Sequence, residues 1–492
     1  MAIIDKDRLL KVLFSFNPWW ITGTVPKEST RPVKRFAYSE AYKILTHPTI
    51  RRSVVLSGAR RVGKTTILYQ LIEEMLNQGI HAKRVLYVSF DHPVLKFCTF
   101  EEILNAYEQN VSGSNENLYL FFDEVHYAGQ WDLWIKYLYD HHKSCKVIAT
   151  GSASPILAAH TAESGVGRWT IIKIPTLSFY EYCELVGVKD LPELPKKLKP
   201  SQLAILPANK LAELMHSLMM LQKHFHRYLL LGGFPEIALS DDVPFAQRVL
   251  REDVVDKVLK RDLTVLFNVR NIAELEKVFL YLCIHSGGLI TIDTIAKEIG
   301  GVARQTVSNY LNLLAAANLI YISNPVEIGG KKVLKSKPKV YIADAAIRNA
   351  VLMLEDVLSD PEEMGVMVET AVYKHVASFY YRQQTRVGYY KQTGKREKEI
   401  DIVVDYPMLG RLLIEVKYRE DLRIGPREAI VELSNDMNTA AAMVITKRAE
   451  DYGLLGAETR VPIVKIPAFA FLYMLGHAEK QGYLLPNSSR KH

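Results

Sequence analysis

Hydrophobic and polar residues alternate along the chain in patterns that predict an α/β protein. From Ser53 onward, short runs of β-branched and aromatic residues are separated by stretches with apolar residues at helical spacing. Strands that alternate with helices are typical of a parallel sheet with helices on both faces. We therefore predict a helix over 64–77 and strands at 54–57, 84–89, 117–122 and 146–150.

The pattern changes after this region. Residues 177–266 have helical spacing, broken by a Pro- and Lys-rich stretch at 191–200 and by Gly232-Gly-Phe-Pro235. Residues 289–300 and 302–320 then predict a helix, a turn and a second helix, followed by two short strands. The last part of the chain predicts a helix at 362–381, strands at 386–391, 398–404 and 411–418, a helix at 426–435 and a strand at 441–446.

The composition narrows the class of protein. A net charge of +8 and an isoelectric point near 9.0 weakly favour a polyanionic partner. The sequence has no apolar run of about 18 residues and no secretory signal pattern, so we expect a cytoplasmic protein with no membrane partner. The four cysteines are widely separated, which indicates neither a zinc site nor a disulfide framework: Cys98, Cys145, Cys183 and Cys283.

A glycine-rich loop with the complete P-loop pattern G-x-x-x-x-G-K-T lies between the first predicted strand and the next helix. The glycines let successive backbone N–H groups and the helix N-terminus face a phosphate. Lys64 would neutralise the β- and γ-phosphates, and Thr65 would be a Mg²⁺ ligand. We predict ATP binding by Gly58, Ala59, Arg60, Arg61, Val62, Gly63, Lys64, Thr65 and Thr66.

Two carboxylates end the third predicted strand. Asp123 and Glu124 follow the apolar run Leu118-Tyr-Leu-Phe-Phe122, downstream of the P-loop. Asp123 would hold the Mg²⁺ shell as a metal residue, and Glu124 would orient or deprotonate the attacking water. This Walker B pattern predicts ATP hydrolysis in addition to binding.

Further polar residues could complete this site. Thr150 or Ser152, after the next strand, stands where AAA+ ATPases carry a polar sensor between phosphate and water. Arg168 could reach a γ-phosphate as an arginine finger, and a surface or structural role for it is equally open. Arg60 and Arg61 could contact phosphate or a neighbouring subunit, or could point to solvent.

Seven segments together give the chain a family likeness. They are Asn17-Pro-Trp-Trp20, Gly58-Ala-Arg-Arg-Val-Gly-Lys-Thr-Thr66, Phe122-Asp-Glu-Val-His126, Thr150-Gly-Ser152, Gly167-Arg168, Pro175-Thr-Leu-Ser-Phe-Tyr-Glu181 and Gly232-Gly-Phe-Pro-Glu236. With these segments, nearly the full chain resembles a prokaryotic family of AAA+-type P-loop ATPases with a C-terminal domain of largely unassigned role. The resemblance implies ATP binding and hydrolysis.

The predicted helix-turn-helix and the strands after it are typical of a winged helix. Arg304, Gln305, Ser308 and Asn309 crowd the start of the second helix, where a recognition helix presents side chains to base edges. Five lysines lie in the predicted wing, Lys331-Lys-Val-Leu-Lys-Ser-Lys-Pro-Lys339, as expected of a surface that contacts a nucleic-acid backbone. The alternative is a winged helix that serves only packing or protein interaction.

The C-terminal element order resembles that of PD-(D/E)XK restriction-endonuclease-like domains. Glu369 lies on the first helix, Asp401 on the second strand, and Glu415 and Lys417 on one face of the third. Asp401 and Glu415 could chelate Mg²⁺, with Glu369 completing the metal shell and Lys417 positioning the nucleophile or balancing the phosphate. Ile400 stands where the motif has proline. The same fold also serves as a non-catalytic binding module.

We therefore expect an α/β protein with five segments, because its 492 residues exceed a single core. Its expected function is an ATP- and Mg²⁺-dependent protein that binds DNA, preferably double-stranded, cleaves it through the C-terminal domain, and forms a homo-oligomer. The alternative is a nucleotide-gated regulatory switch with a non-catalytic C-terminal domain. The segments are an N-terminal lead-in (1–50), a P-loop AAA+ ATPase domain (51–176), a helical lid (177–268), a winged helix (269–345) and a PD-(D/E)XK nuclease-like domain (360–480).

Overall fold

The chain divides into two compact units in the computed structural model. The first comprises Met1–Pro175 with Ala316–Asn318, and the second comprises Thr176–Ala315 and Leu319–His492. The structure describes residues 5–112, 117–151, 167–195, 198–267, 269–326, 337–354, 356–381, 385–392, 398–406 and 409–482.

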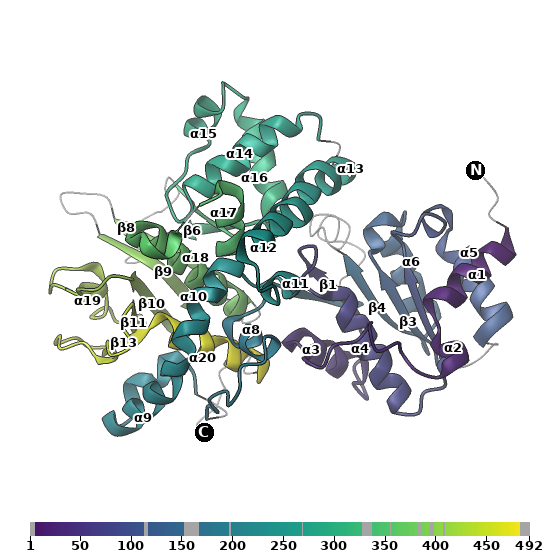
Figure 1. Cartoon of the computed structure of the whole chain (residues 1–492), viewed down its shortest axis with the longest axis horizontal. Helices are drawn as coiled ribbons and strands as arrows, with labels where there is room; N and C mark the ends of the chain where they lie inside the picture. Colours follow the sequence, from purple (N-terminus) through teal and green to yellow (C-terminus); the bar gives the residue numbers. More distant parts are fainter. Residues whose placement is uncertain are drawn as a thin grey trace. The chain divides into compact units, whose positions relative to one another are not determined.

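A parallel sheet with the order β2-β3-β4-β1-β5 forms the centre of the first unit (Figure 1). Its central strands are buried along nearly their whole length, as expected for a parallel sheet covered by helices. The four predicted strands are confirmed, whereas β5 was not predicted. The strands are β1 (Ser53–Gly58), β2 (Val85–Ser89), β3 (Tyr119–Asp123), β4 (Lys146–Gly151) and β5 (Trp169–Ile174).

Amphipathic helices pack on this sheet. Helix α4 buries Ile67, Leu68 and Leu71 at helical spacing and lies against β1 and β4, while α3 lies against β1 and β5. The helical segments of this unit are α1 (Lys6–Phe16), α2 (Trp19–Thr22), α3 (Phe36–Leu45), α4 (Lys64–Asn77), η1 (Ala82–Arg84), η2 (Leu95–Phe97), α5 (Phe100–Tyr107), η3 (Glu108–Ser112), η4 (Val125–Tyr127) and α6 (Trp131–His141).

Side chains of the N-terminal segment cap the outer strand β2. Asn17 accepts a hydrogen bond from the Tyr87 N–H at 2.6 Å and donates one to the Tyr87 carbonyl at 2.9 Å. The indole N–H groups of Trp19 and Trp20 both donate to the Val85 carbonyl. An edge strand with unpaired backbone groups can pair with another chain, so these side chains protect the edge as well as packing against it.

The second unit begins with helices. Those before its sheet are α8 (Phe179–Leu185), η5 (Pro200–Ile205), α9 (Ala208–Leu218), η6 (Met219–Leu221), α10 (Gln222–Leu231), α11 (Pro235–Ala238), α12 (Val243–Val249), η7 (Leu250–Asp256), η8 (Val258–Asp262), α13 (Leu263–Phe267), α14 (Ile272–Ile284), α15 (Ile292–Glu298) and α16 (Arg304–Ala316). The pair α15 and α16 confirms the predicted helix, turn and helix.

One mixed sheet runs through the rest of the second unit, in the order β12-β13-β11-β10-β9-β8-β6-β7 within the described residues. β6 pairs antiparallel with β7 and parallel with β8, so the two strands of the predicted wing continue the C-terminal sheet. The strands are β6 (Ile320–Pro325), β7 (Lys339–Ile342), β8 (Arg386–Gln392), β9 (Lys398–Tyr406), β10 (Gly410–Lys417), β11 (Thr439–Thr446), β12 (Gly453–Leu454) and β13 (Ile463–Pro467).

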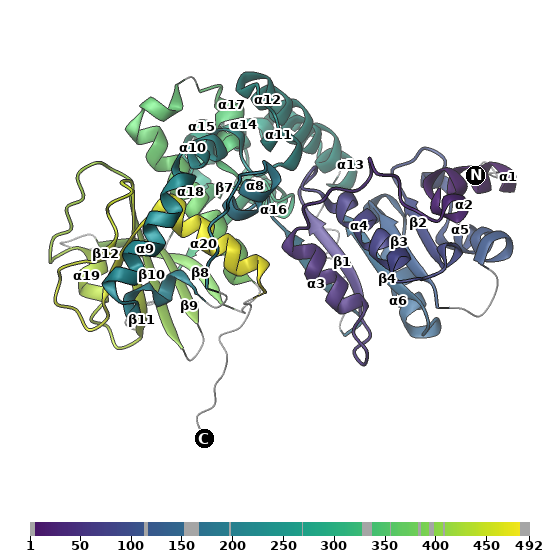
Figure 2. The ribbon, with the colours of Figure 1, turned by 60° about the horizontal axis from the view of Figure 1, so that its bottom comes forward.

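The two faces of this sheet pack in different cores. Successive residues of β10 alternate, with Leu412 and Ile414 in one core and Leu413 in the other, as period-two geometry requires. The larger core contains the long helix α18, the C-terminal helix α20 and Phe179, Leu211 and other residues of the predicted lid (Figure 2). The remaining helices are α17 (Ala345–Leu352), η9 (Val357–Ser359), α18 (Pro361–Tyr380), α19 (Ala429–Leu433) and α20 (Ala468–Lys480).

These contacts correct the predicted domain organisation. The predicted boundary at 176/177 nearly coincides with the division between the two units. The predicted lid, winged helix and nuclease-like domain, however, lie in one unit, and the lid shares its core with the C-terminal sheet. Apolar spacing identifies which residues are buried but not which distant element buries them, so it could not reveal this shared core.

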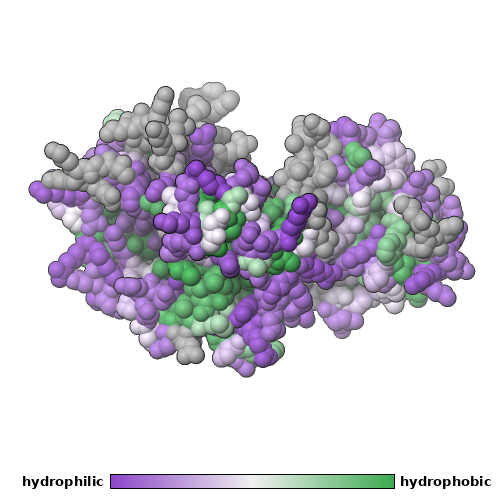
Figure 3. All heavy atoms as spheres, turned by 90° about the horizontal axis from the view of Figure 1, so that it is seen from above, coloured by the Kyte–Doolittle hydropathy of each residue, from purple (hydrophilic) through white to green (hydrophobic). Residues whose placement is uncertain are grey.

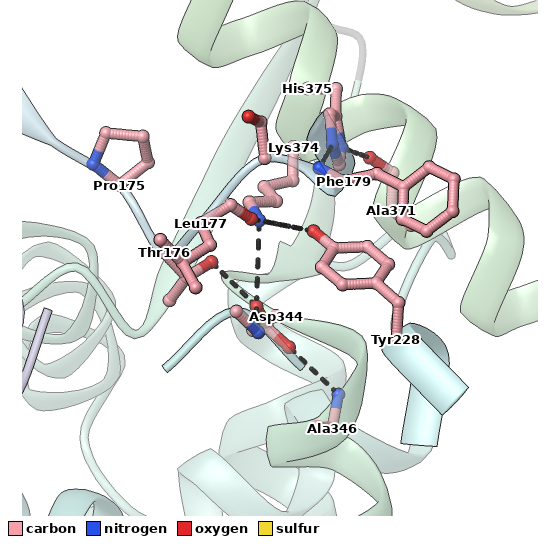
Figure 4. A network of polar contacts seen from close by, with 12 residues as sticks. Pro175, Thr176, Leu177, Phe179, Tyr228, Asp344, Ala346, Ala371, Lys374 and His375 are labelled. Atoms are coloured by element: carbon pink, nitrogen blue, oxygen red, sulfur yellow. Dashed lines mark hydrogen bonds and ion pairs between the residues drawn. The ribbon is translucent and has the colours of Figure 1, made fainter. Parts of the chain in front are cut away.

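A buried polar network holds the first residues of the second unit (Figure 4). Asp344 accepts hydrogen bonds from the Thr176 hydroxyl at 2.6 Å and from backbone N–H groups, and lies 3.7 Å from the Lys374 ammonium. Lys374 also donates to the Leu177 carbonyl and the Tyr228 hydroxyl. A Cβ at Gly232 would overlap Asp344, and its φ of +75° is one that glycine tolerates best.

None of the helices in the described ranges is long and apolar enough to cross a membrane. On the face drawn in Figure 3, hydrophilic residues predominate and hydrophobic residues gather in smaller areas.

Candidate functional site

The P-loop follows β1 in the predicted geometry. A Cβ at Gly58 would overlap the Ile174 carbonyl, so glycine is needed where β1 and β5 end side by side. Gly63 has φ +93° and precedes α4, whose N-terminus therefore points into the loop. The Lys64 ammonium is buried and donates to the Gly58 and Ala59 carbonyls at 3.0 and 2.9 Å.

Arg35 braces this loop from α3's N-terminal side and was not predicted. Its guanidinium donates to the Val62 carbonyl at 2.9 Å and to the Pro175 carbonyl at 3.0 Å. Arg35 is buried, which makes it part of the loop's support. Nothing in the local sequence distinguishes it from the neighbouring Arg31 and Lys34.

Hydroxyl groups surround the buried Asp123 at the end of β3. The Thr65 hydroxyl donates to Asp123 Oδ2 at 2.7 Å, the Tyr87 hydroxyl donates to the same oxygen at 2.9 Å, and the Thr150 hydroxyl donates to Oδ1. Burial raises the pKa of Asp123, Glu124 raises it further, and the three hydroxyls oppose this. The structure thus brings together Thr65, Asp123 and Thr150, and adds Tyr87, which the sequence did not identify.

Glu124 occupies an unusual backbone conformation beside these residues. Its φ is +51°, in the left-handed region that non-glycine residues seldom adopt, and its N–H donates to the Thr150 hydroxyl at 3.0 Å. Its carboxylate lies 3.2 Å from Nδ1 of the buried His126. Burial lowers the pKa of His126 to about 3, with Lys64 and Arg60 acting in the same direction, so His126 is neutral. Strained residues of this kind cluster at functional sites.

The other predicted residues of the ATPase site lie apart from this group or outside the described residues. Arg168 precedes β5 at the sheet edge opposite the P-loop, since Trp169 pairs with Ser53 at the start of β1. Its guanidinium pairs with Asp140 at 3.0 Å, so it does not serve the phosphate site of its own chain. A role toward a neighbouring copy, which needs an oligomer, stays a prediction. Arg60 and Arg61 are partly buried, and Ser152 is outside the described residues.

The predicted C-terminal residues converge in the second unit. Asp401 on β9 accepts a hydrogen bond from the Val416 N–H of β10 at 2.8 Å, which places it beside Glu415. The Lys417 ammonium pairs with Glu415 at 2.7 Å and lies 3.7 Å from Glu428. Glu369 on α18 accepts a hydrogen bond from the Tyr341 hydroxyl at 2.8 Å.

Lys339 lies among these carboxylates, which corrects its predicted place in a DNA-contacting wing. Its ammonium is 2.6 Å from Glu399, 3.7 Å from Asp401 and 3.8 Å from Glu369, and only 5% of its side chain is exposed. It lies here because β7 joins the C-terminal sheet through β6. Glu399 and Lys339 were both missed as members of this group. The rest of the lysine run, apart from Lys337, is outside the described residues.

Excess negative charge and burial perturb this group. Burial, followed by the nearby Asp401, raises the pKa of Glu369 to about 7 and that of Glu415 to about 8. Burial lowers the pKa of Lys339, but Glu369, Asp401 and Glu399 outweigh it and the net pKa is raised. Within the described ranges, no three or more His, Cys, Asp or Glu side chains are arranged to hold a metal ion. The predicted metal pair Asp401 and Glu415 is therefore not arranged as a complete ligand set.

The predicted recognition residues lie on the exposed side of α16. Arg304, Gln305 and Asn309 are exposed and Ser308 is half-buried. Arg304 pairs with Asp293 of α15, and Gln305 donates to Asn309 at 3.0 Å. These side chains are accessible to a partner and pair with one another.

Comparison with protein families supports the class of the first unit. Residues 50–183 match an AAA domain, and the parallel sheet, P-loop and Asp123 arrangement have the features of an AAA+ P-loop ATPase domain. Residues 222–358 match a domain of unknown function, DUF8612, and residues 364–469 match another, DUF4143.

Several proteins are similar over most of the chain. An uncharacterised protein of Haemophilus influenzae is 26% identical over 60% of this chain and 68% of its own. A second, of Methanocaldococcus jannaschii, is 25% identical over 71% of each chain.

Among solved structures, matches include the RuvB Holliday junction branch migration motor of Thermotoga maritima, 15% identical, covering 58% of this chain and 87% of its own, with a TM-score of 0.27. The Aeropyrum pernix ORC1 protein in complex with DNA is 12% identical, covering 68% and 96%, with a TM-score of 0.32.

Proposed function

We propose that the first unit binds ATP together with Mg²⁺ and hydrolyses it. The observation that carries this proposal is the 2.7 Å hydrogen bond between Thr65 of the P-loop and Asp123 of β3. A hydroxyl and a carboxylate oxygen held together at the end of a glycine-rich loop suit the hard, oxygen-preferring Mg²⁺. When bound, the ion bridges the β- and γ-phosphates and neutralises the charge that develops on them.

The residues of this unit divide the work. The backbone N–H groups before α4 face the phosphates, and the Lys64 ammonium, which now donates to two loop carbonyls, would turn to phosphate oxygens. Thr150 holds both Asp123 and the Glu124 backbone, so it fixes the two carboxylates relative to each other. Glu124 would orient or deprotonate the attacking water once its side chain leaves His126.

Glu124→Gln tests this assignment. The variant should bind ATP with Mg²⁺ as the wild type does, measured by calorimetry, and lose about a hundredfold or more of its phosphate release, because a general base contributes that much. Glu101→Gln, at an exposed glutamate of the same unit, is the matched control and should retain turnover. Retained turnover in Glu124→Gln would refute the role of Glu124.

We further propose that the exposed side of α16 contacts duplex DNA. Arg304, Gln305 and Asn309 supply charged and amide groups of the kind that contact phosphates and base edges. Arg304→Ala should weaken binding to a labelled duplex and lower the salt dependence by about one counterion. Arg423, also exposed and paired with a nearby aspartate, is the control: Arg423→Ala should bind as the wild type. Equal losses in both variants would indicate general charge attraction instead.

A second candidate function is phosphodiester cleavage by the C-terminal group. The convergence of Asp401, Glu415 and Lys417 favours it, since such a set can activate water and balance phosphate charge. Incubation of wild type and Asp401→Ala with nucleic acid and Mg²⁺ or Mn²⁺ separates the possibilities. Cleavage by the wild type alone supports a nuclease. Intact nucleic acid in both favours the alternative, a nucleotide-gated regulatory switch whose C-terminal domain binds a partner without cutting it.

A further inference from the structure

The C-terminal carboxylate group contains its own cation. The Lys339 ammonium lies within 4 Å of three carboxylates, those of Glu399, Asp401 and Glu369. Its side chain reaches this position from β7, whose backbone pairing with β6 is regular, and its ammonium also lies 5.5 Å from the centre of the Tyr389 ring. An almost fully buried ammonium in this position shows that the group accommodates a positive charge.

The ammonium does not balance the group. The carboxylates of Glu369, Glu399, Asp401, Glu415 and Glu428 face the ammonium groups of Lys339, Lys391 and Lys417. Five potential negative charges against three positive ones leave a deficit of two positive charges.

A second observation points to a missing ligand. Oε2 of Glu415 is buried and has no hydrogen-bond partner, while its other oxygen pairs with Lys417, and only 10% of this side chain is exposed. A buried carboxylate oxygen without a donor is costly and calls for a cation or a proton.

We propose that Lys339 occupies the cation position of this group, and that a divalent cation binds there only when the Lys339 ammonium leaves. The incoming ion brings two positive charges and the departing ammonium removes one, so the exchange reduces the excess of negative charge. Loss of Lys339 also frees Asp401 and Glu369 to approach the ion together with Glu415. The exchange explains why these carboxylates are not arranged as a ligand set while Lys339 is in place.

This inference uses the carboxylates of the second candidate function but does not depend on cleavage. Its readout is metal binding, so a positive result with no cleavage would refute only the nuclease. No binding by a protein that still cleaves would refute only the exchange.

Calorimetric titration of the full chain with Mn²⁺ tests the exchange. Lys339→Met should bind Mn²⁺ about tenfold or more tightly than the wild type, because the competing charge is gone. Lys391→Met is the matched control, since Lys391 also pairs with Glu399, at 3.0 Å, and is not near Asp401; it should bind as the wild type. Adding Asp401→Asn to Lys339→Met should abolish the gain.

Equal Mn²⁺ affinity in wild type and Lys339→Met, or a gain that survives Asp401→Asn, would overturn the proposal. Because the loss of a buried ammonium could prevent folding, the wild-type chain provides an independent measurement. Amine-reactive labelling read by mass spectrometry should modify Lys339 slowly without metal and several-fold faster with saturating Mn²⁺. Unchanged labelling of Lys339 would equally overturn the exchange.

Discussion

Replacing Asp344 by asparagine should destabilise the second unit strongly. The substitution keeps the shape of the side chain but removes the negative charge 3.7 Å from the Lys374 ammonium. Both side chains are only 3% exposed, so water cannot replace the lost charge. It also turns one acceptor oxygen into an N–H donor, where Asp344 now accepts from the Thr176 hydroxyl and two backbone N–H groups.

The expected magnitude follows from the burial of this pair. Removing one partner of a buried ion pair costs about 3–5 kcal/mol, because the other charge is left desolvated. With a urea dependence of about 3 kcal/mol per M, the midpoint of unfolding should fall by about 1 M or more. Lys374→Met should also destabilise the unit. The double variant should be less destabilised than the sum of the two single variants, because the two side chains interact directly.

The distribution of aromatic residues allows each unit to be followed separately. All five tryptophans of the chain, at positions 19, 20, 131, 134 and 169, precede Thr176. Tryptophan fluorescence therefore reports on the first unit, while far-ultraviolet circular dichroism reports on both. In Asp344→Asn, a circular-dichroism transition should move to lower urea while the fluorescence transition keeps its midpoint.

Two results would refute this reasoning. A loss of less than about 1 kcal/mol in Asp344→Asn would mean that the ion pair carries little stability, as at exposed sites. Strict additivity in the double variant would mean that Asp344 and Lys374 act independently.

Three further predictions concern other parts of the molecule. Gly58→Ala should lower the stability of the first unit by about 1–3 kcal/mol by fluorescence and weaken ATP binding, whereas Gly129→Ala, with open space around it, should not; equal effects would contradict the close approach to Ile174. Asn17→Ala should cost about 2–4 kcal/mol in the same assay because it leaves both Tyr87 backbone groups without their partners, and a loss below about 1 kcal/mol would show that the edge of β2 is satisfied by water. Burial lowers the pKa of His375 far below its usual value, so its contribution is complete above pH about 6.5 and is lost as the pH falls, by up to about 1.4 kcal/mol per pH unit; His375→Gln should reduce this slope, and an unchanged slope would refute the assignment.

Much of the fold could be predicted from local pattern. The P-loop between β1 and α4, and the helix and strands from α18 to β11, follow from apolar spacing and turn residues over a few neighbours. The meeting of Thr65 with Asp123 was also predictable, since parallel strands end at one edge of a sheet. β5 was missed because its run, Trp169–Ile174, is short and interrupted by polar residues.

The sequence by itself determined the chemistry available to this protein: the phosphate-binding loop, the Asp123 and Glu124 pair, and the carboxylates of the C-terminal strands. Only the tertiary structure decided which charges meet. Lys339 belongs to a lysine run that predicts an exposed wing, yet the pairing of β6 with β8 buries it among Glu399, Asp401 and Glu369. Arg168 lies at the sheet edge away from the phosphates for a similar reason, its place in the strand register. Side-chain type is a local property, whereas the partner of a buried charge is set by contacts between residues far apart in the chain.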